Sequence, residues 1–185
     1  MIILVNSEKY KSLFLPNLPF GEYRIHYLGL TRCISIQSRD GILFNLYLSK
    51  TSVNTTEVKG NITNYVEIDD FLNLEINMAV KDSIGGWKDN AFVFKEPKAC
   101  SSLKKLLGKA WTQIMDGGGF YNATCPIPRG FYKVSGVDTA VFSSINFSKT
   151  FFYGSYKFRF FFTKNNEVYG CFVLVIELRR PWETN

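Results

Sequence analysis

Apolar and polar residues alternate along most of the chain after Tyr23, and the alternation is most regular over residues 72–81. Every second position there is apolar, and the positions between hold asparagine, glutamate, alanine and lysine. The apolar set is Leu72, Leu74, Ile76, Met78 and Val80. A period of two predicts a strand with one buried and one solvated face, as in an antiparallel sheet.

Three further segments extend this β pattern. Residues 42–50 and 156–164 alternate with more aromatic side chains, whereas residues 168–179 are apolar on both faces. A strand that is apolar on both faces is covered on both sides, so we expect 168–179 to be a central strand. The pair Asn165-Asn166 separates the last two segments and predicts a short hairpin turn.

Residues 97–115 break the β pattern and predict one amphipathic helix over about 98–115. Apolar residues recur there at three- and four-residue spacing, and lysines occupy the other side. Pro97 lies just before the segment and three glycines follow it at 117–119, as at the start and end of a helix. The apolar residues are Ala99, Leu103, Leu106, Leu107, Ala110, Trp111 and Ile114.

The predicted elements amount to one mainly β domain. A chain of 185 residues fits a single domain, and no repeat or linker divides it. Residues 1–22 contain Pro16, Pro19 and Gly21 and are interpreted as an irregular N-terminal arm, which leaves residues 23–182 as the domain. About seven or eight strands with one late helix predict an antiparallel β-sandwich.

Composition and charge narrow the classes of partner. The chain is 46% hydrophobic and 16% aromatic with 17 phenylalanines, which indicates a packed core. No apolar run is long enough to span a bilayer. The net charge is +6, but lysines and arginines are spread along the chain, so no nucleic-acid-binding tail is predicted. A positive surface favours contact with anionic membranes.

Four cysteines, Cys33, Cys100, Cys125 and Cys171, are too far apart for a C-x-x-C motif. A zinc site would need these scattered cysteines to converge with the single histidine, so no metal site is predicted. An even number of isolated cysteines fits two disulfides, which form in oxidising compartments.

Four N-glycosylation sequons also indicate passage through the secretory pathway. They begin at Asn54, Asn61, Asn122 and Asn146. Residues 1–5 are apolar for too short a stretch to form the hydrophobic region of a signal peptide. We therefore expect a secreted protein in a mature or truncated form, with an added start methionine.

The sequence offers no enzyme site and implies no cofactor. The one histidine, His26, lies in an alternating strand-like segment and is interpreted as structural. The carboxylates are scattered, and Asp69-Asp70 precedes a strand at a turn. A two-carboxylate hydrolase stays open as an alternative without supporting residues.

Aromatic residues also cluster where periodicity is poor. The cluster within residues 141–156 comprises Phe142, Phe147, Phe151, Phe152 and Tyr153. Trp87 follows two glycines at 85–86. Core filling explains any one of these side chains, and loops whose tips contact a ligand or membrane explain the clustering.

Four features in order resemble the ganglioside activator family and its insect chemosensory relatives, within the ML lipid-recognition group. They are a cysteine before an early strand, "KACSSLKKLL", "CPIPRGFYKV" and "FFYGSYKFRFFFTKNNEVYGCFVLVIEL". The resemblance covers residues 30–180 and is specific in the C-terminal half. It implies a cup-shaped sandwich, with Cys100 bonded to Cys125 and Cys33 to Cys171. The activator's additional cysteines and its residues for docking a hexosaminidase have no counterpart here.

The leading hypothesis is a secreted, non-enzymatic carrier that shields a fatty acid, phospholipid, glycolipid or other hydrophobic ligand between its sheets. Ordinary core packing explains the same lining candidates equally well. The alternative is a surface interaction module that serves as a cofactor for a receptor or a glycolipid hydrolase, and insect relatives suggest a pheromone or taste role. The lining candidates are Leu74, Ile76, Met78, Val80, Phe158, Phe160, Phe162, Trp111 and Ile114.

Overall fold

The computed structural model describes residues 18–33, 40–53, 55–121 and 124–183. Their strands are β1 (Phe20–Glu22), β2 (Arg24–Arg32), β3 (Ile42–Lys50), β4 (Thr56–Asn64), β5 (Asn73–Lys81), β6 (Trp87–Glu96), β7 (Gly130–Asp138), β8 (Thr150–Phe152), β9 (Gly154–Lys164) and β10 (Glu167–Arg179). The helical elements are α2 (Ala99–Leu107), η2 (Gly108–Ala110), α3 (Trp111–Gly117) and η3 (Thr139–Ser144). The protein is therefore mainly β, as the alternation predicted.

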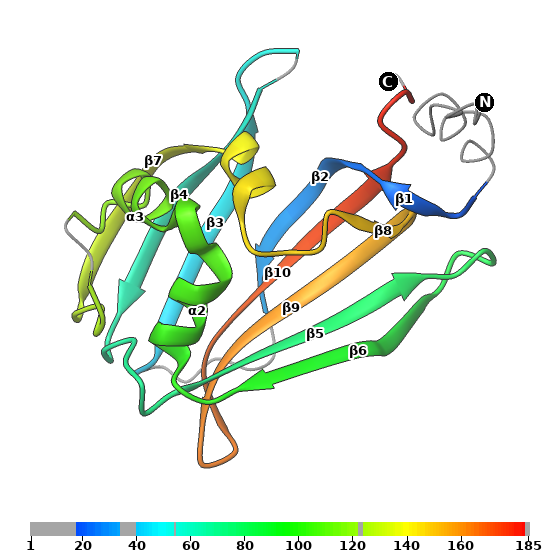
Figure 1. The fold of residues 1–185 in the computed structure, drawn as a ribbon. Coiled ribbons are helices and arrows are strands. Elements are labelled where there is room, and N and C mark those ends of the chain that lie inside the picture. Colours follow the sequence, from blue (N-terminus) through cyan, green and yellow to red (C-terminus); the bar gives the residue numbers. More distant parts are fainter. Residues whose placement is uncertain (1–17, 34–39, 54, 122–123, 184–185) are drawn as a thin grey trace, which may run out of the picture.

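The strands form a sandwich-like arrangement. In the larger sheet the order β6-β5-β9-β10 makes one strand group, and β2 pairs with the other edge of β10. The order β3-β4-β7 makes a second group, joined to the first where Gly170 of β10 pairs with Ile42 of β3. A side chain at position 170 would place its Cβ 2.8 Å from that of Ile42, so glycine permits this close junction. Figure 1 shows the two groups diverging from there.

The predicted strands are confirmed, and the last of them is central. Residues 42–50 form β3, while 72–81, 156–164 and 168–179 correspond to β5, β9 and β10. β10 pairs with β9 on one side and with β2 and β3 on the other, so it is central in the sheet. Asn165 and Asn166 form the predicted hairpin turn with φ values of 50° and 64°.

The predicted helix spans residues 99–117 and is interrupted at Gly108, where φ is +53°. Its start lacks a cap from its own N-cap residue, Lys98, and is closed from the β4–β5 connection instead. The Asp70 carboxylate accepts from the backbone N–H of Ser101 at 2.9 Å and from its hydroxyl at 2.6 Å. At the interruption, Asn146 Nδ2 donates to the carbonyl of Lys105 at 2.7 Å.

The helical segment bridges the two strand groups, because α2 contacts β5 and α3 contacts β7. Figure 1 shows it in front of the junction of the sandwich. None of the described helices is long and apolar enough to cross a bilayer.

Both disulfides have the pairing that the family resemblance implied, Cys33–Cys171 and Cys100–Cys125. Cys125 precedes a cis peptide bond to Pro126, and the turn continues into a bridge between Ile127 and Ile68. Backbone hydrogen bonds of 3.0 Å run both ways across that bridge. The cysteine before the proline-containing turn therefore fastens that turn to the start of α2.

The expected N-terminal arm needs one correction. Residues 20–22 form β1, which pairs antiparallel with β8 in a separate two-stranded sheet. The Tyr153 hydroxyl also donates to the carbonyl of Glu22 at 3.0 Å. The strand partner lies 130 positions away in sequence, which a local pattern of prolines and glycines does not reveal. Residues 1–17 of the expected arm lie outside the described residues.

Candidate ligand-binding face

One face of the β6-β5-β9-β10-β2 group is apolar over nearly its whole length, and we call it the inner face. On β9 it carries Tyr156, Phe158, Phe160 and Phe162, which lie opposite Val80, Met78, Ile76 and Leu74 of β5. On the other side they lie opposite Ile176, Leu174, Phe172 and Gly170 of β10. Because directly paired residues share a face of the sheet, these side chains form one continuous surface.

The part of this face beside the junction is fully covered, and we call it the closed end. Leu74 and Phe162 are buried there against the second strand group and the helical segment, and Phe162 stacks on Phe44 with ring centroids 5.8 Å apart. Trp111 and Met115 of α3 belong to the same buried cluster. The closed end is a packed core.

The part farthest from the junction has a different cover, and we call it the open end. Its buried residues are Met78, Tyr156, Ile176 and Leu178. The cover is the irregular segment 139–152, which contains η3 and β8. Two aromatic side chains of this segment face the open end: Phe147 contacts Phe158 at 6.4 Å and Phe151 contacts Tyr156 at 5.4 Å, measured between ring centroids. Phe142 packs against the closed-end cluster, and its ring centroid lies 6.2 Å from that of Tyr27.

Three tyrosine hydroxyls donate hydrogen bonds to this cover, and one of them is that of Tyr23, to the carbonyl of Ser148 at 2.5 Å. Tyr27 donates to the carbonyl of Thr139 at 3.2 Å, and Tyr156 donates to the carbonyl of Phe152 at 2.8 Å. Burial raises the pKa of both phenols above the usual value for tyrosine. Both therefore stay neutral donors over the whole physiological range of pH.

Between the two ends lies a strip of half-buried side chains, which we call the inner stripe: Ile76, Phe158, Phe160, Phe172 and Leu174. The rings of Phe160 and Phe172 stack at 4.6 Å, and those of Phe158 and Phe160 lie 6.4 Å apart. Phe160 belongs to neither buried cluster. Towards the sheet edge the stripe continues into Phe94 and Phe92 of β6, and Phe92 is 55% exposed.

The structure divides the predicted lining residues among these regions. Leu74, Phe162 and Trp111 are core of the closed end, and Ile114 is half-buried beside them. Met78 is buried at the open end, with Val80 packed against it. Ile76, Phe158 and Phe160 lie on the inner stripe.

Sequence reasoning missed the other members of the stripe, Phe172 and Leu174, and its edge, Phe92 and Phe94. Both faces of β10 are apolar, so periodicity gives no sign of which residues point inward. The β6 phenylalanines lie in a segment without regular alternation, and only their pairing with Met78 and Ile76 reveals their face.

The aromatic residues predicted to contact a ligand or membrane do not lie together. Phe147 and Phe151 face the open end, whereas Phe142 packs against the closed-end cluster. Phe152 is 55% exposed and pairs edge-to-face with Phe20 at 5.1 Å. Tyr153 lies beneath the guanidinium of Arg180, 4.7 Å from the ring centroid. Trp87 lies beneath the ammonium of Lys157 at 4.6 Å, on the opposite face of the sheet.

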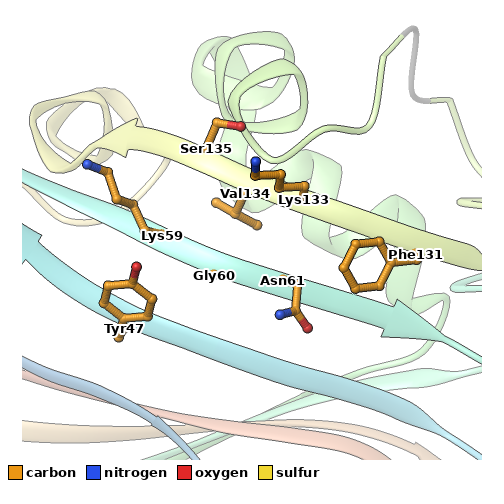
Figure 2. A pocket seen from close by; sticks show the side chains of 8 residues that line it. All are labelled: Tyr47, Lys59, Gly60, Asn61, Phe131, Lys133, Val134 and Ser135. Carbon is orange, nitrogen blue, oxygen red and sulfur yellow. The ribbon is translucent and has the colours of Figure 1, made fainter.

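The sequons have unequal surroundings. Asn61 lies on the outer face of β4 beside an open pocket of about 460 Å³, shown in Figure 2. Asn146 is engaged with the helix through its side-chain nitrogen. Asn54 and Asn122 lie outside the described residues.

The groups considered for catalysis are separate. His26 pairs with Glu177 across β2 and β10, on the face opposite the inner stripe. Asp69 accepts from the backbone N–H groups of Phe71 and Leu72, and Asp70 caps the helix. The described part of the chain holds no group of three or more His, Cys, Asp or Glu side chains placed to bind a metal.

No protein-family model matches this chain, and no curated protein is similar to it at a significant level.

Proposed function

We propose that this protein is a secreted, non-enzymatic carrier that binds the acyl chain of a fatty acid or other lipid along the inner stripe. The observation that carries the proposal is the partial exposure of five large apolar side chains in the middle of the inner face, of which Phe160 lies outside both buried clusters. Large contiguous apolar surfaces that stay accessible in a folded protein commonly mark binding sites.

The stripe suits a chain-like ligand. It runs from the core of the closed end to the cover of the open end, and its positions on β5, β9 and β10 are uncharged. Arg32 of β2, which pairs with Phe172, places one cation at the edge of the stripe. Each methylene removed from water contributes roughly 0.8 kcal/mol before the cost of association is subtracted. A chain of about ten methylenes therefore supplies up to about 8 kcal/mol of gross stabilisation.

The proposed location and family rest on other features. Two disulfides fit an oxidising compartment. The resemblance to the ganglioside activator and chemosensory proteins supports a lipid as the ligand. For an insect protein it also supports a pheromone- or taste-related role.

Ligand loading is proposed to take place at a membrane, through the open end. Phe20 is 42% exposed, and Phe152, the last residue of the cover segment, is 55% exposed. Two basic residues accompany them: Lys149 lies within the same segment, and Arg180 donates to the carbonyl of Leu18, two residues before Phe20. Exposed apolar tips flanked by basic residues suit transient contact with anionic lipid surfaces.

A surface interaction module is the second candidate, and the edge strand β6 favours it. Phe92 and Val93 are 55% and 46% exposed on opposite faces of this strand. An edge strand has unpaired backbone groups on one side, which another chain can use for pairing. A receptor or a glycolipid hydrolase would then be the partner.

Binding of a stearic acid that carries an anthroyloxy fluorophore tests the carrier proposal, with the delipidated full chain. Phe160→Ala should weaken binding about tenfold, because roughly 1.4 kcal/mol of apolar contact is lost. Phe161→Ala is the matched control, since Phe161 is also half-buried but lies on the opposite face of β9. Equal effects of the two substitutions, or no binding by the parent protein, would overturn the proposal.

A further inference from the structure

The outer face of the second strand group contains a pocket that the carrier proposal does not use. Its lining comes from β3, β4 and β7: Tyr47, Lys59, Gly60, Asn61, Phe131, Lys133, Val134 and Ser135. Two of these are aromatic side chains that are unusually exposed for a sheet surface, Tyr47 at 54% and Phe131 at 67%. Figure 2 shows Asn61 between them.

The position of Asn61 follows from strand alternation. Its neighbour Ile62 is buried in the core cluster, so Asn61 points to the opposite, solvated face. Asn61 pairs directly with Asn45 of β3 and with Lys133 of β7. The two aromatic residues are its diagonal neighbours, because Tyr47 pairs with Lys59 and Phe131 with Thr63. Diagonal neighbours on one face lie about 7–8 Å apart between α-carbons, within reach of a group attached to Asn61.

The amide of Asn61 is oriented by one hydrogen bond. Its Oδ1 accepts from Asn45 Nδ2 at 3.1 Å, and no hydrogen bond from its Nδ2 is present among the described residues. Nδ2 is the atom that carries an N-linked sugar, and Asn61-Ile62-Thr63 is a sequon. Asn146 contrasts with it, because its Nδ2 donates to the helix backbone.

We infer that Asn61 carries an N-linked glycan whose first N-acetylglucosamine ring lies in this pocket against Phe131 and Tyr47. In the transfer, the bond between the sugar C1 and a phosphate oxygen of a polyprenyl diphosphate-linked oligosaccharide breaks. A bond from C1 to Asn61 Nδ2 forms, and the proton lost from Nδ2 passes to the released diphosphate. The Oδ1 acceptor is unchanged by this reaction, so the hydrogen bond from Asn45 is kept.

The chemistry of the pocket matches that of the sugar. A pyranose ring has a face of C–H groups, which can cover an exposed aromatic ring and remove it from water. Its hydroxyl and acetamide oxygens can accept from the ammonium groups of Lys59 and Lys133, which line the pocket. Lys59 also pairs with the carboxylate of Glu57 at 3.0 Å. The attached ring is held at high effective concentration, so weak contacts suffice to keep it in place.

The inference rests on the secretory location within the proposed function and not on the lipid ligand. The full chain should therefore be directed through a eukaryotic secretory host and compared with Thr63→Val, which removes the sequon but keeps Asn61. Glycopeptide mass spectrometry should find a glycan at Asn61 in the parent alone. Retained binding of the fluorescent stearic acid by Thr63→Val would show that the two proposals are separable.

Thermal unfolding then tests whether the first sugar ring contacts the aromatic residues of the pocket, after an endoglycosidase trims each glycan to one N-acetylglucosamine. The parent should melt about 2–4 °C above Thr63→Val. When oligosaccharide transfer is blocked, the two proteins should melt within about 1 °C of each other. Phe131→Ala should remove most of the difference, whereas Tyr65→Ala, an exposed aromatic outside the pocket, should leave it intact.

An unmodified Asn61 in the secreted protein would overturn the inference. So would a modified Asn61 whose stabilising effect is the same with and without the Phe131 ring, since the sugar would then project into solvent.

Discussion

The closed end and the open end of the sandwich share the strands β5, β9 and β10 but are covered in different ways. At the closed end the cover is a 19-residue helical segment that is fastened by the Cys100–Cys125 disulfide and capped by Asp70. At the open end the cover is the irregular segment 139–152, held by the hydroxyls of Tyr27 and Tyr156 and by the short strands β1 and β8. One inner face is therefore covered at one end by a helical segment fastened by a disulfide and at the other by an irregular segment held by hydrogen bonds, including those from Asn146 to the helix.

The difference teaches that an apolar sheet face is not by itself a core. Phe162 and Phe160 lie two residues apart on the same face of the same strand. Phe162 is 2% exposed because the helix and the second strand group cover it, whereas Phe160 is half-buried. The kind of cover decides whether a phenylalanine is fully buried or stays partly exposed.

The sharpest test of the comparison is to truncate both side chains. Phe162→Ala should lower the free energy of unfolding by about 3–5 kcal/mol, because it leaves a cavity in a fully packed cluster. Phe160→Ala should cost roughly half as much, since part of its surface is already in water. Urea unfolding followed by circular dichroism measures both. Equal losses would mean that the inner stripe is ordinary core.

Removing the disulfide that fastens the helical segment over the closed end should have the next largest effect on the free energy of unfolding. The double substitution Cys100→Ser and Cys125→Ser opens a loop whose ends are 25 residues apart. Chain entropy alone predicts a loss of about 3–4 kcal/mol. Urea unfolding of this variant should show that loss, while hydrogen exchange localises the added opening to residues 99–117. Increased exchange confined to residues 139–152 would contradict the assigned role of this disulfide.

Loosening the cover of the open end should affect ligand exchange more than stability. Tyr27→Phe and Tyr156→Phe each remove one hydrogen bond to the cover, at a cost of about 1 kcal/mol. Dissociation of the fluorescent stearic acid, followed by stopped flow, should become several-fold faster in both variants. Tyr132→Phe is the control, because its hydroxyl donates to the carbonyl of Pro128, away from the inner face. An equal acceleration in that control would show that the hydrogen bonds to the cover do not limit the rate of ligand release.

The smallest expected effect concerns the cap of the helix and depends on pH. Hydrogen bonds from the Ser101 side chain and backbone hold the pKa of Asp70 below its usual value. The folded state therefore gains stability from this carboxylate above the pKa of the unfolded chain, and loses it as the pH falls through the lower, folded value.

Asp70→Asn should accordingly destabilise the protein by less than about 1 kcal/mol at neutral pH, because the carboxylate is exposed to solvent. The difference from the parent should shrink as the pH falls below about 4. Thermal unfolding between pH 7 and pH 2.5 measures this trend. Ser101→Ala should reproduce part of it, and a difference that grows with acidity would contradict the assignment.

Sequence reasoning reached the fold because most of its signals are local. The period of two in β5, the helical spacing of residues 99–114 and the Asn165-Asn166 turn each reflect a periodicity or turn preference that acts within a few residues. The disulfide pairing came from the family resemblance. The candidate site was placed less completely, because the inward face of β10 and the role of Phe92 and Phe94 depend on which strands pair.

The sequence by itself determined the class of elements, the single helical segment and the cysteines available to fasten it, because these depend on local spacing and composition. Only the tertiary structure decided which apolar residues became core and which remained as the inner stripe. It also joined residues 20–22 to β8 and set Asn61 between two exposed aromatic rings. Those outcomes depend on contacts between segments far apart in sequence, and burial is a property of the neighbours that cover a side chain rather than of the side chain itself.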